Sequence, residues 1–153
     1  MRAANEDSYL ADPPVFVVAD GMGGHDRGDV ASAIVVEEFA RLASEGYDAE
    51  HGAEVVATTL HAVQERILAF DVEQRANGAD ADFSAGTTAV IALLVDSVSG
   101  PVWLLANVGD SRIYRFNEGE PGAGQRRPQP GPGDSSTRAR SARPRRPSTP
   151  TAT

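Results

Sequence analysis

The fold of this chain is built around one stretch near its start, Val15-Phe16-Val17-Val18-Ala19-Asp20-Gly21-Met22-Gly23-Gly24-His25. An apolar run rich in β-branched residues ends in an aspartate, and a glycine-rich turn follows. The pattern predicts a buried strand that delivers one carboxylate to the edge of a sheet, where the backbone approaches a neighbour closely. An ordinary strand and turn, with Asp20 capping the next element, fits the same residues, because glycine-rich loops alone are weak motifs.

The composition of the 153 residues excludes several kinds of active site. The absence of cysteine excludes a disulfide framework, a thiolate zinc site and a cysteine nucleophile. All 14 basic residues are arginine, which excludes a P-loop lysine and a Schiff-base lysine. The sequence shows no signal peptide and no apolar run long enough to span a membrane. We therefore expect a cytoplasmic protein with no membrane contact.

Charge divides the chain into two unequal parts. Up to Phe116 there are 19 acidic residues and seven arginines, and beyond it there are three acidic residues and seven arginines. The acidic part argues against nucleic acid as a ligand and is compatible with bound cations.

The first two predicted strands bring three carboxylates together. A polar turn leads into a strand that ends at Ala11, Asp12-Pro13-Pro14 forms a tight connection, and Val15–Ala19 returns as the second strand. Strands joined by so short a turn lie antiparallel and adjacent. Glu6 and Asp7 should therefore lie near Asp20, where three carboxylates repel one another unless a cation intervenes.

Two helices and three further strands complete an α+β pattern. The first helix begins at Gly28 or Asp29, with aspartate as its cap, and ends at Gly46; the second runs from about Glu50 to Gln74. Their expected buried stripes are Ala31, Val35, Phe39 and Leu42, and Val56, Leu60, Val63, Ile67 and Phe70, while Glu37, Glu38 and Arg41 should face away. The later strands are expected at residues 86–95, 102–107 and 112–116. The first of these is almost wholly apolar, so we expect it to be covered on both faces.

Residues 121–153 form a separate segment of arginine, proline, glycine and small polar residues. It contains no Val, Ile, Leu, Met or aromatic residue, so it is predicted to be disordered. The arginines suit an anionic partner, although no aromatic residues alternate with them as in single-strand nucleic-acid binders. The alternative, which we favour, is a frameshift in a GC-rich gene, because such DNA read out of frame encodes mainly Arg, Pro, Ala and Gly.

Four motifs follow one another in the first 120 residues: Arg2-x-x-x-Glu6-Asp7, Asp20-Gly21-Met22-Gly23-Gly24-His25, Gly86-Thr87-Thr88 and Asn107-Val108-Gly109-Asp110-Ser111-Arg112. In this order around two helices they closely resemble the PPM/PP2C family of metal-dependent protein serine/threonine phosphatases, in its bacterial form. The resemblance implies hydrolysis of phosphoserine and phosphothreonine proteins with two Mn²⁺ or Mg²⁺ ions, cations that prefer oxygen ligands. Two such ions about 3.5–4 Å apart grip phosphate oxygens and activate water.

The resemblance also assigns roles to individual residues. Asp20 would bridge the two metals, Glu6 would bind one of them, and Gly21 would contribute its backbone carbonyl. Asp7 would hold water around the metals, and Arg2 would orient the substrate phosphate.

Other positions in these motifs have two interpretations. Asp110 matches a position that binds a third metal in bacterial members, and it could equally form an Asx-turn. Gly86-Thr87-Thr88 fits packing and strand entry better than chemistry. His25 suggests a general acid, but eukaryotic members carry that histidine immediately after Asp-Gly, so a loop histidine is favoured. Arg112 could pair with a carboxylate without touching substrate.

The family domain is about twice as long and consists of two stacked antiparallel sheets flanked by helix pairs. The resemblance therefore covers the N-terminal half, residues 1–120, and implies an incomplete β-sandwich with one flanking helix pair. Such a fragment is expected to be inactive or weakly active. The alternative from another class is a non-catalytic phosphatase-like module that binds phosphoproteins or regulates a partner.

Overall fold

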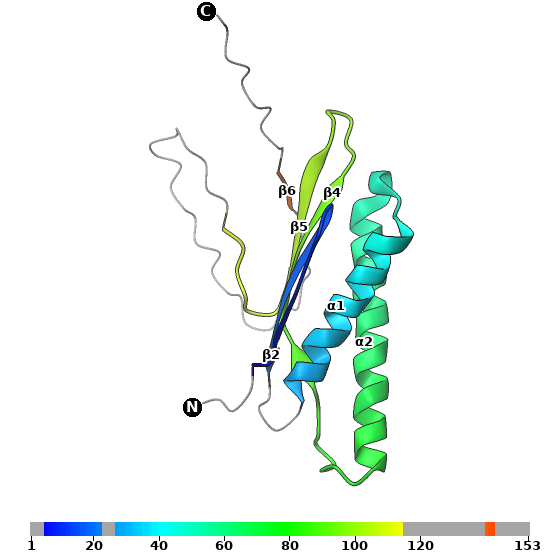
Figure 1. Ribbon diagram of the computed structural model, residues 1–153, viewed down its shortest axis with the longest axis vertical. Helices are drawn as coiled ribbons and strands as arrows, with labels where there is room; N and C mark the ends of the chain where they lie inside the picture. Colours follow the sequence, from blue (N-terminus) through cyan, green and yellow to red (C-terminus); the bar gives the residue numbers. More distant parts are fainter. Residues whose placement is uncertain (1–4, 23–26, 115–139, 143–153) are drawn as a thin grey trace, which may run out of the picture.

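The computed structural model describes residues 5–22, 27–114 and 140–142, and it has the expected α+β architecture (Figure 1). Two helices form one layer and an antiparallel sheet forms the other. The elements are β1 (Asp7–Asp12), β2 (Val15–Met22), α1 (Gly28–Glu45), a short 3₁₀ turn η1 (Ala49–His51), α2 (Gly52–Ala76), β3 (Gly86–Thr87), β4 (Ala89–Val95), β5 (Val102–Val108) and β6 (Arg140–Ala142). Neither described helix combines the length and the apolar character needed to cross a membrane.

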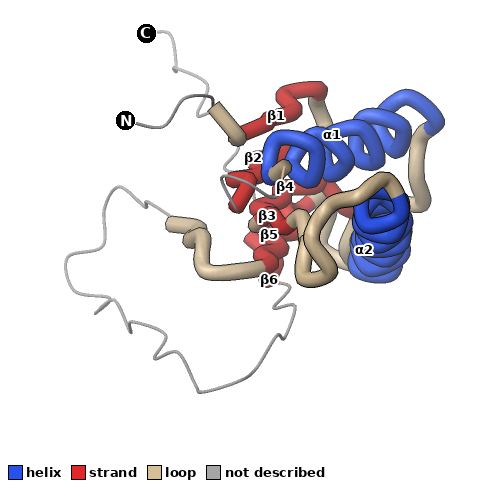
Figure 2. The backbone as a smooth tube through the Cα atoms, turned by 90° about the horizontal axis from the view of Figure 1, so that it is seen from below, coloured by secondary structure: helices blue, strands red, loops and turns tan. Residues whose placement is uncertain are grey.

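The strands are paired in the order β1-β2-β4-β5-β6, and the short β3 pairs with the end of β2 (Figure 2). Pro13 and Pro14 form the two-residue turn between β1 and β2, which confirms the predicted hairpin. Its register places Asp7 opposite Asp20. The start of β1 and the end of β2 therefore lie at the same end of the sheet.

Both helices cover the same face of the sheet, and the core lies between the two layers (Figures 1 and 2). Val15, Val17 and Ala19 of β2 are fully buried there, because alternate residues of a strand point to the same face. The stripes predicted for the two helices are confirmed. Ala31, Val35 and Phe39 are buried on α1, and Val56, Val63 and Ile67 on α2, while the other three members of the stripes are partly buried against the core: Leu42, Leu60 and Phe70.

Strand β4 was expected to be covered on both faces, and within the described residues that prediction is wrong. Its residues alternate between buried and half-buried along the whole strand. The reason is that α1 and α2 both pack on one face, and no described segment covers the other. On that open face Phe16 of β2 meets Trp103 of β5 edge to face, with ring centroids 5.7 Å apart.

Two details of α1 also differ from the sequence prediction. Glu38 was expected to face solvent, but it is only 5% exposed and is held by ion pairs to Arg41 and to Arg66 of α2. The helix packs against α2 on this side as well as against the sheet, and the two arginines neutralise the carboxylate there. Asp29 lies inside the first turn, where it pairs with Arg27 at 3.0 Å, and does not cap the helix.

The segment after β5 departs from the predicted strand at residues 112–116. Residues 111–114 follow a bend and form no strand, and residues 115 and 116 lie outside the described part. The edge of β5 pairs instead with β6, three residues of the tail for which disorder was predicted. An open edge offers unpaired N–H and C=O groups to any backbone, whatever its side chains. The rest of the tail lies outside the described residues.

Candidate functional site

Asp7 and Asp20 lie opposite each other at one end of the sheet. The two residues are direct cross-strand partners, and both are exposed on the face opposite the helices. Side chains in such a pair have Cβ atoms roughly 4.5–5.5 Å apart, and like charges there are destabilising. Among the described residues neither carboxylate takes part in an ion pair. The pair therefore favours a cation between the two strands.

Gly21 lies beside this pair and is packed too tightly for any side chain. A Cβ atom at Gly21 would lie 2.3 Å from the carbonyl oxygen of Gly28 and 2.5 Å from that of Glu6. The first residue of α1 therefore packs directly on the end of β2. The Gly21 N–H donates to the Glu6 carbonyl at 3.2 Å, but within the described residues Glu6 does not return the bond. The Gly21 carbonyl is thus left without that partner, as a ligand carbonyl would need to be.

Glu6 is held in place through its backbone. Its carbonyl also accepts a hydrogen bond from the Ser32 hydroxyl of α1 at 2.6 Å, and the same hydroxyl lies 2.9 Å from that of Ser8. Sequence reasoning missed Ser32. The signal was available, because Ser32 is the polar member of an otherwise apolar stripe that includes Val35 and Phe39.

The threonines before β4 are bonded to the backbone of Asp20. Thr88 N–H donates to the Asp20 carbonyl at 2.9 Å, and the Thr87 hydroxyl donates to the same oxygen at 3.0 Å. The Thr88 hydroxyl in turn lies 2.8 Å from the Ser111 hydroxyl. The sequence interpretation of these threonines as packing and strand entry is therefore incomplete, because they also support the residue that carries the central carboxylate.

Asp110 lies at the same end of the sheet, directly after β5. It is exposed, and it follows Gly109, whose φ of +90° suits glycine in this bend. The described hydrogen bonds include none accepted by the Asp110 side chain, so they do not support the Asx-turn alternative. Arg112 is exposed and forms no ion pair with a described carboxylate. Arg2 and His25 lie outside the described residues.

The group thus brought together is smaller than a complete ligand set. The described residues contain no cluster of three or more carboxylate or histidine side chains able to hold a metal, so the predicted meeting of all three carboxylates of Glu6, Asp7 and Asp20 is wrong. What they provide is the Asp7–Asp20 pair and the Gly21 carbonyl. This donor set fits Mg²⁺ or Mn²⁺, because Mg²⁺ commonly keeps several waters and takes only one or two protein carboxylates.

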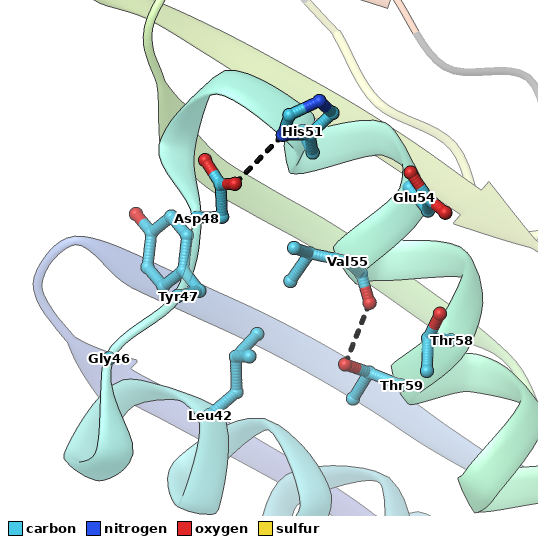
Figure 3. A pocket seen from close by; sticks show the side chains of 9 residues that line it. All are labelled: Leu42, Gly46, Tyr47, Asp48, His51, Glu54, Val55, Thr58 and Thr59. Atoms are coloured by element: carbon cyan, nitrogen blue, oxygen red, sulfur yellow. Dashed lines mark hydrogen bonds and ion pairs between the residues drawn. The ribbon is translucent and has the colours of Figure 1, made fainter.

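A groove lies near the opposite end of the sheet (Figure 3). It is an open groove of about 530 Å³ at the junction of α1 and α2, with Leu42, Tyr47 and Val55 on its walls. His51 contacts Asp48 there at 2.8 Å, which raises the pKa of the imidazole through the hydrogen bond and the negative charge. The groove adjoins the C-terminal end of β4, because the N–H of Asp96, the residue after that strand, donates to the Ala49 carbonyl. Thr88, at the acidic end, is the residue before β4. The seven residues of β4, spanning roughly 23 Å, therefore separate the groove from the acidic end.

Comparison with known proteins gives one consistent result. A profile of the protein phosphatase 2C family matches residues 3–129. The serine/threonine protein phosphatase PstP of Mycobacterium tuberculosis is 36% identical over 123 residues, which cover 78% of this chain and 21% of PstP. The serine/threonine phosphatase stp of Listeria monocytogenes is 38% identical over 109 residues, or 66% of this chain and 38% of stp.

Solved structures agree with these relatives. The catalytic domain of PstP in complex with two manganese ions superposes with a TM-score of 0.58 at 34% identity, covering 73% of this chain and 44% of that domain. PppA of Pseudomonas aeruginosa superposes with a TM-score of 0.55 at 33% identity, covering 73% of this chain and 45% of PppA. The chain therefore spans less than half of each of these proteins.

Proposed function

This chain belongs to the protein phosphatase 2C family, and on that premise we propose that its acidic sheet end is part of a metal-dependent serine/threonine protein phosphatase site. The observation that carries the proposal is the opposed, exposed pair of Asp7 and Asp20 beside the Gly21 carbonyl. Mn²⁺ or Mg²⁺ bound there would supply charge neutralisation for a phosphate group and acidify water at neutral pH. The PstP domain with two manganese ions supports the choice of cation.

The chain's own residues would divide the work of holding cation and substrate. Asp20 lies between the β1 edge and the β3–β4 segment, so its carboxylate would be the central ligand. The Gly21 carbonyl would bind beside it, the family resemblance adds Glu6 as a further ligand, and Asp7 would hydrogen-bond to water near the cation. Asp110, two residues after the end of β5, would be a further oxygen ligand.

Substrate recognition is assigned to the arginine that precedes the first acidic motif. Arg2 would orient the phosphate of a phosphoserine or phosphothreonine protein, because its planar guanidinium can bind two phosphate oxygens at once. The relatives are phosphatases, so a non-catalytic binding module is not favoured. A cytoplasmic location stays a prediction.

The test is Mn²⁺-dependent hydrolysis of p-nitrophenyl phosphate, with Mn²⁺ binding followed separately by electron paramagnetic resonance. The described residues offer two clustered carboxylates, so we expect weak binding and slow turnover, both lost in Asp20→Asn. Asp12→Asn is the matched control, because Asp12 is an exposed carboxylate at the other end of β1. Equal effects of the two substitutions would overturn the proposed site. Rapid turnover by the 153-residue chain would refute the expectation that it is weakly active.

A further inference from the structure

Thr88 connects two acidic segments that are far apart in the sequence. Its side chain is buried, with 2% exposure, although it carries a hydroxyl. The backbone of Thr88 donates to the Asp20 carbonyl at 2.9 Å, and the Asp20 N–H lies 3.4 Å from the Thr88 hydroxyl oxygen. Thr88 thus contacts Asp20 through both its backbone and its side chain.

The other side of Thr88 supports the bend that carries Asp110. The Thr88 and Ser111 hydroxyls form a hydrogen bond of 2.8 Å. A Cβ atom at Gly109 would lie 2.9 Å from the Thr88 methyl group, so the backbone of the bend packs against it. The residues on both sides of Asp110 therefore contact the same threonine.

We propose that Thr88 is a positioning residue that sets the separation between Asp20 and Asp110. A threonine suits this task, because its β-branched side chain has few rotamers and presents a hydroxyl and a methyl group in fixed directions. The hydroxyl joins Asp20 to Ser111, and the methyl group supports Gly109. The inference rests on the proposed function, since the separation matters only if both carboxylates bind cations.

The test compares Mn²⁺ affinity, measured by electron paramagnetic resonance, among variants of the full chain. Thr88→Val keeps the shape and removes the hydroxyl, and we expect affinity to fall roughly 10-fold, as for other residues that orient metal ligands. Thr88→Ser keeps the hydroxyl and should retain most of the wild-type Mn²⁺ affinity. Thr59→Val is the matched control, because among the described residues the Thr59 hydroxyl bonds only within α2, to the Val55 carbonyl at 2.9 Å.

Ser111→Ala removes the same hydrogen bond from a half-buried position, so it tests the proposal even if Thr88→Val does not fold. The expected result is a similar loss of affinity, with no further loss in the double variant. Wild-type affinity in Ser111→Ala, or equal losses in Thr88→Ser and a folded Thr88→Val, would overturn the positioning role. If Asp20→Asn itself leaves affinity unchanged, the proposed function fails, and the inference fails with it.

Discussion

Substituting Gly21 by alanine should destabilise the chain where the first helix meets the sheet. The new Cβ atom would lie 2.3 Å from the Gly28 carbonyl oxygen and 2.5 Å from that of Glu6, and both obstacles are backbone atoms that cannot rotate away. Overpacking typically costs about 1–3 kcal/mol, and rigid obstacles favour the upper end of that range. Alanine also lowers the entropy of the unfolded chain, which offsets roughly 0.4–1 kcal/mol. The expected net loss is about 2 kcal/mol.

Urea unfolding followed by the fluorescence of Trp103 measures this loss. Trp103 is the only tryptophan, and it packs against Phe16 in the sheet. With a slope of about 2 kcal/mol per molar urea, the midpoint should fall by about 1 M. Gly86→Ala is the matched control, because the nearest atom to its Cβ is the flexible end of Met22, 3.8 Å away. The reasoning is refuted if Gly21→Ala and Gly86→Ala have the same midpoint.

Two further predictions concern other parts of the fold. Asp71 is 3% exposed and accepts the Ala85 N–H at 2.9 Å, so Asp71→Ala should cost about 1–3 kcal/mol in urea unfolding. Asp71→Asn keeps an acceptor and should cost less; the reverse order would contradict this role. Asp48→Asn should lower the pKa of His51 in an NMR titration, because Asp48 holds it above its ordinary value. The stabilisation from this pair is complete below the unfolded pKa and disappears as pH rises through the raised value, a dependence that should be weaker in Asp48→Asn.

Local patterns were sufficient for the centre of the candidate site. The two prolines after Asp12 allow only a tight turn, and a tight turn sets the register that places Asp7 opposite Asp20. The apolar stripe of α2 predicted its buried face for a similar reason, since helical periodicity depends on neighbouring residues alone.

Long-range contacts were beyond the reach of those patterns. Glu38 was expected in solvent because its burial depends on Arg66, 28 residues later on the other helix. The support of Asp20 by Thr88 spans 68 residues, and that of Thr88 by Ser111 spans 23. Nothing in the spacing of the sequence identifies such partners. The strand expected at residues 112–116 was wrong in its described part for a related reason, because strand formation needs a neighbour to pair with.

Local sequence patterns specify which residues carry charge to the end of the sheet and which strands bring them there. Alternation, turn chemistry and the order of the motifs are local, so they can be followed from Glu6 to Asp110 along the sequence. How those carboxylates are held follows from contacts between distant segments: Gly28 packs on Gly21, the hydroxyls of Ser32 and Thr88 bond to the strand ends, and both described helices lie on one face of the sheet. Packing and hydrogen bonding between distant segments depend on the whole folded chain, and no short stretch encodes them.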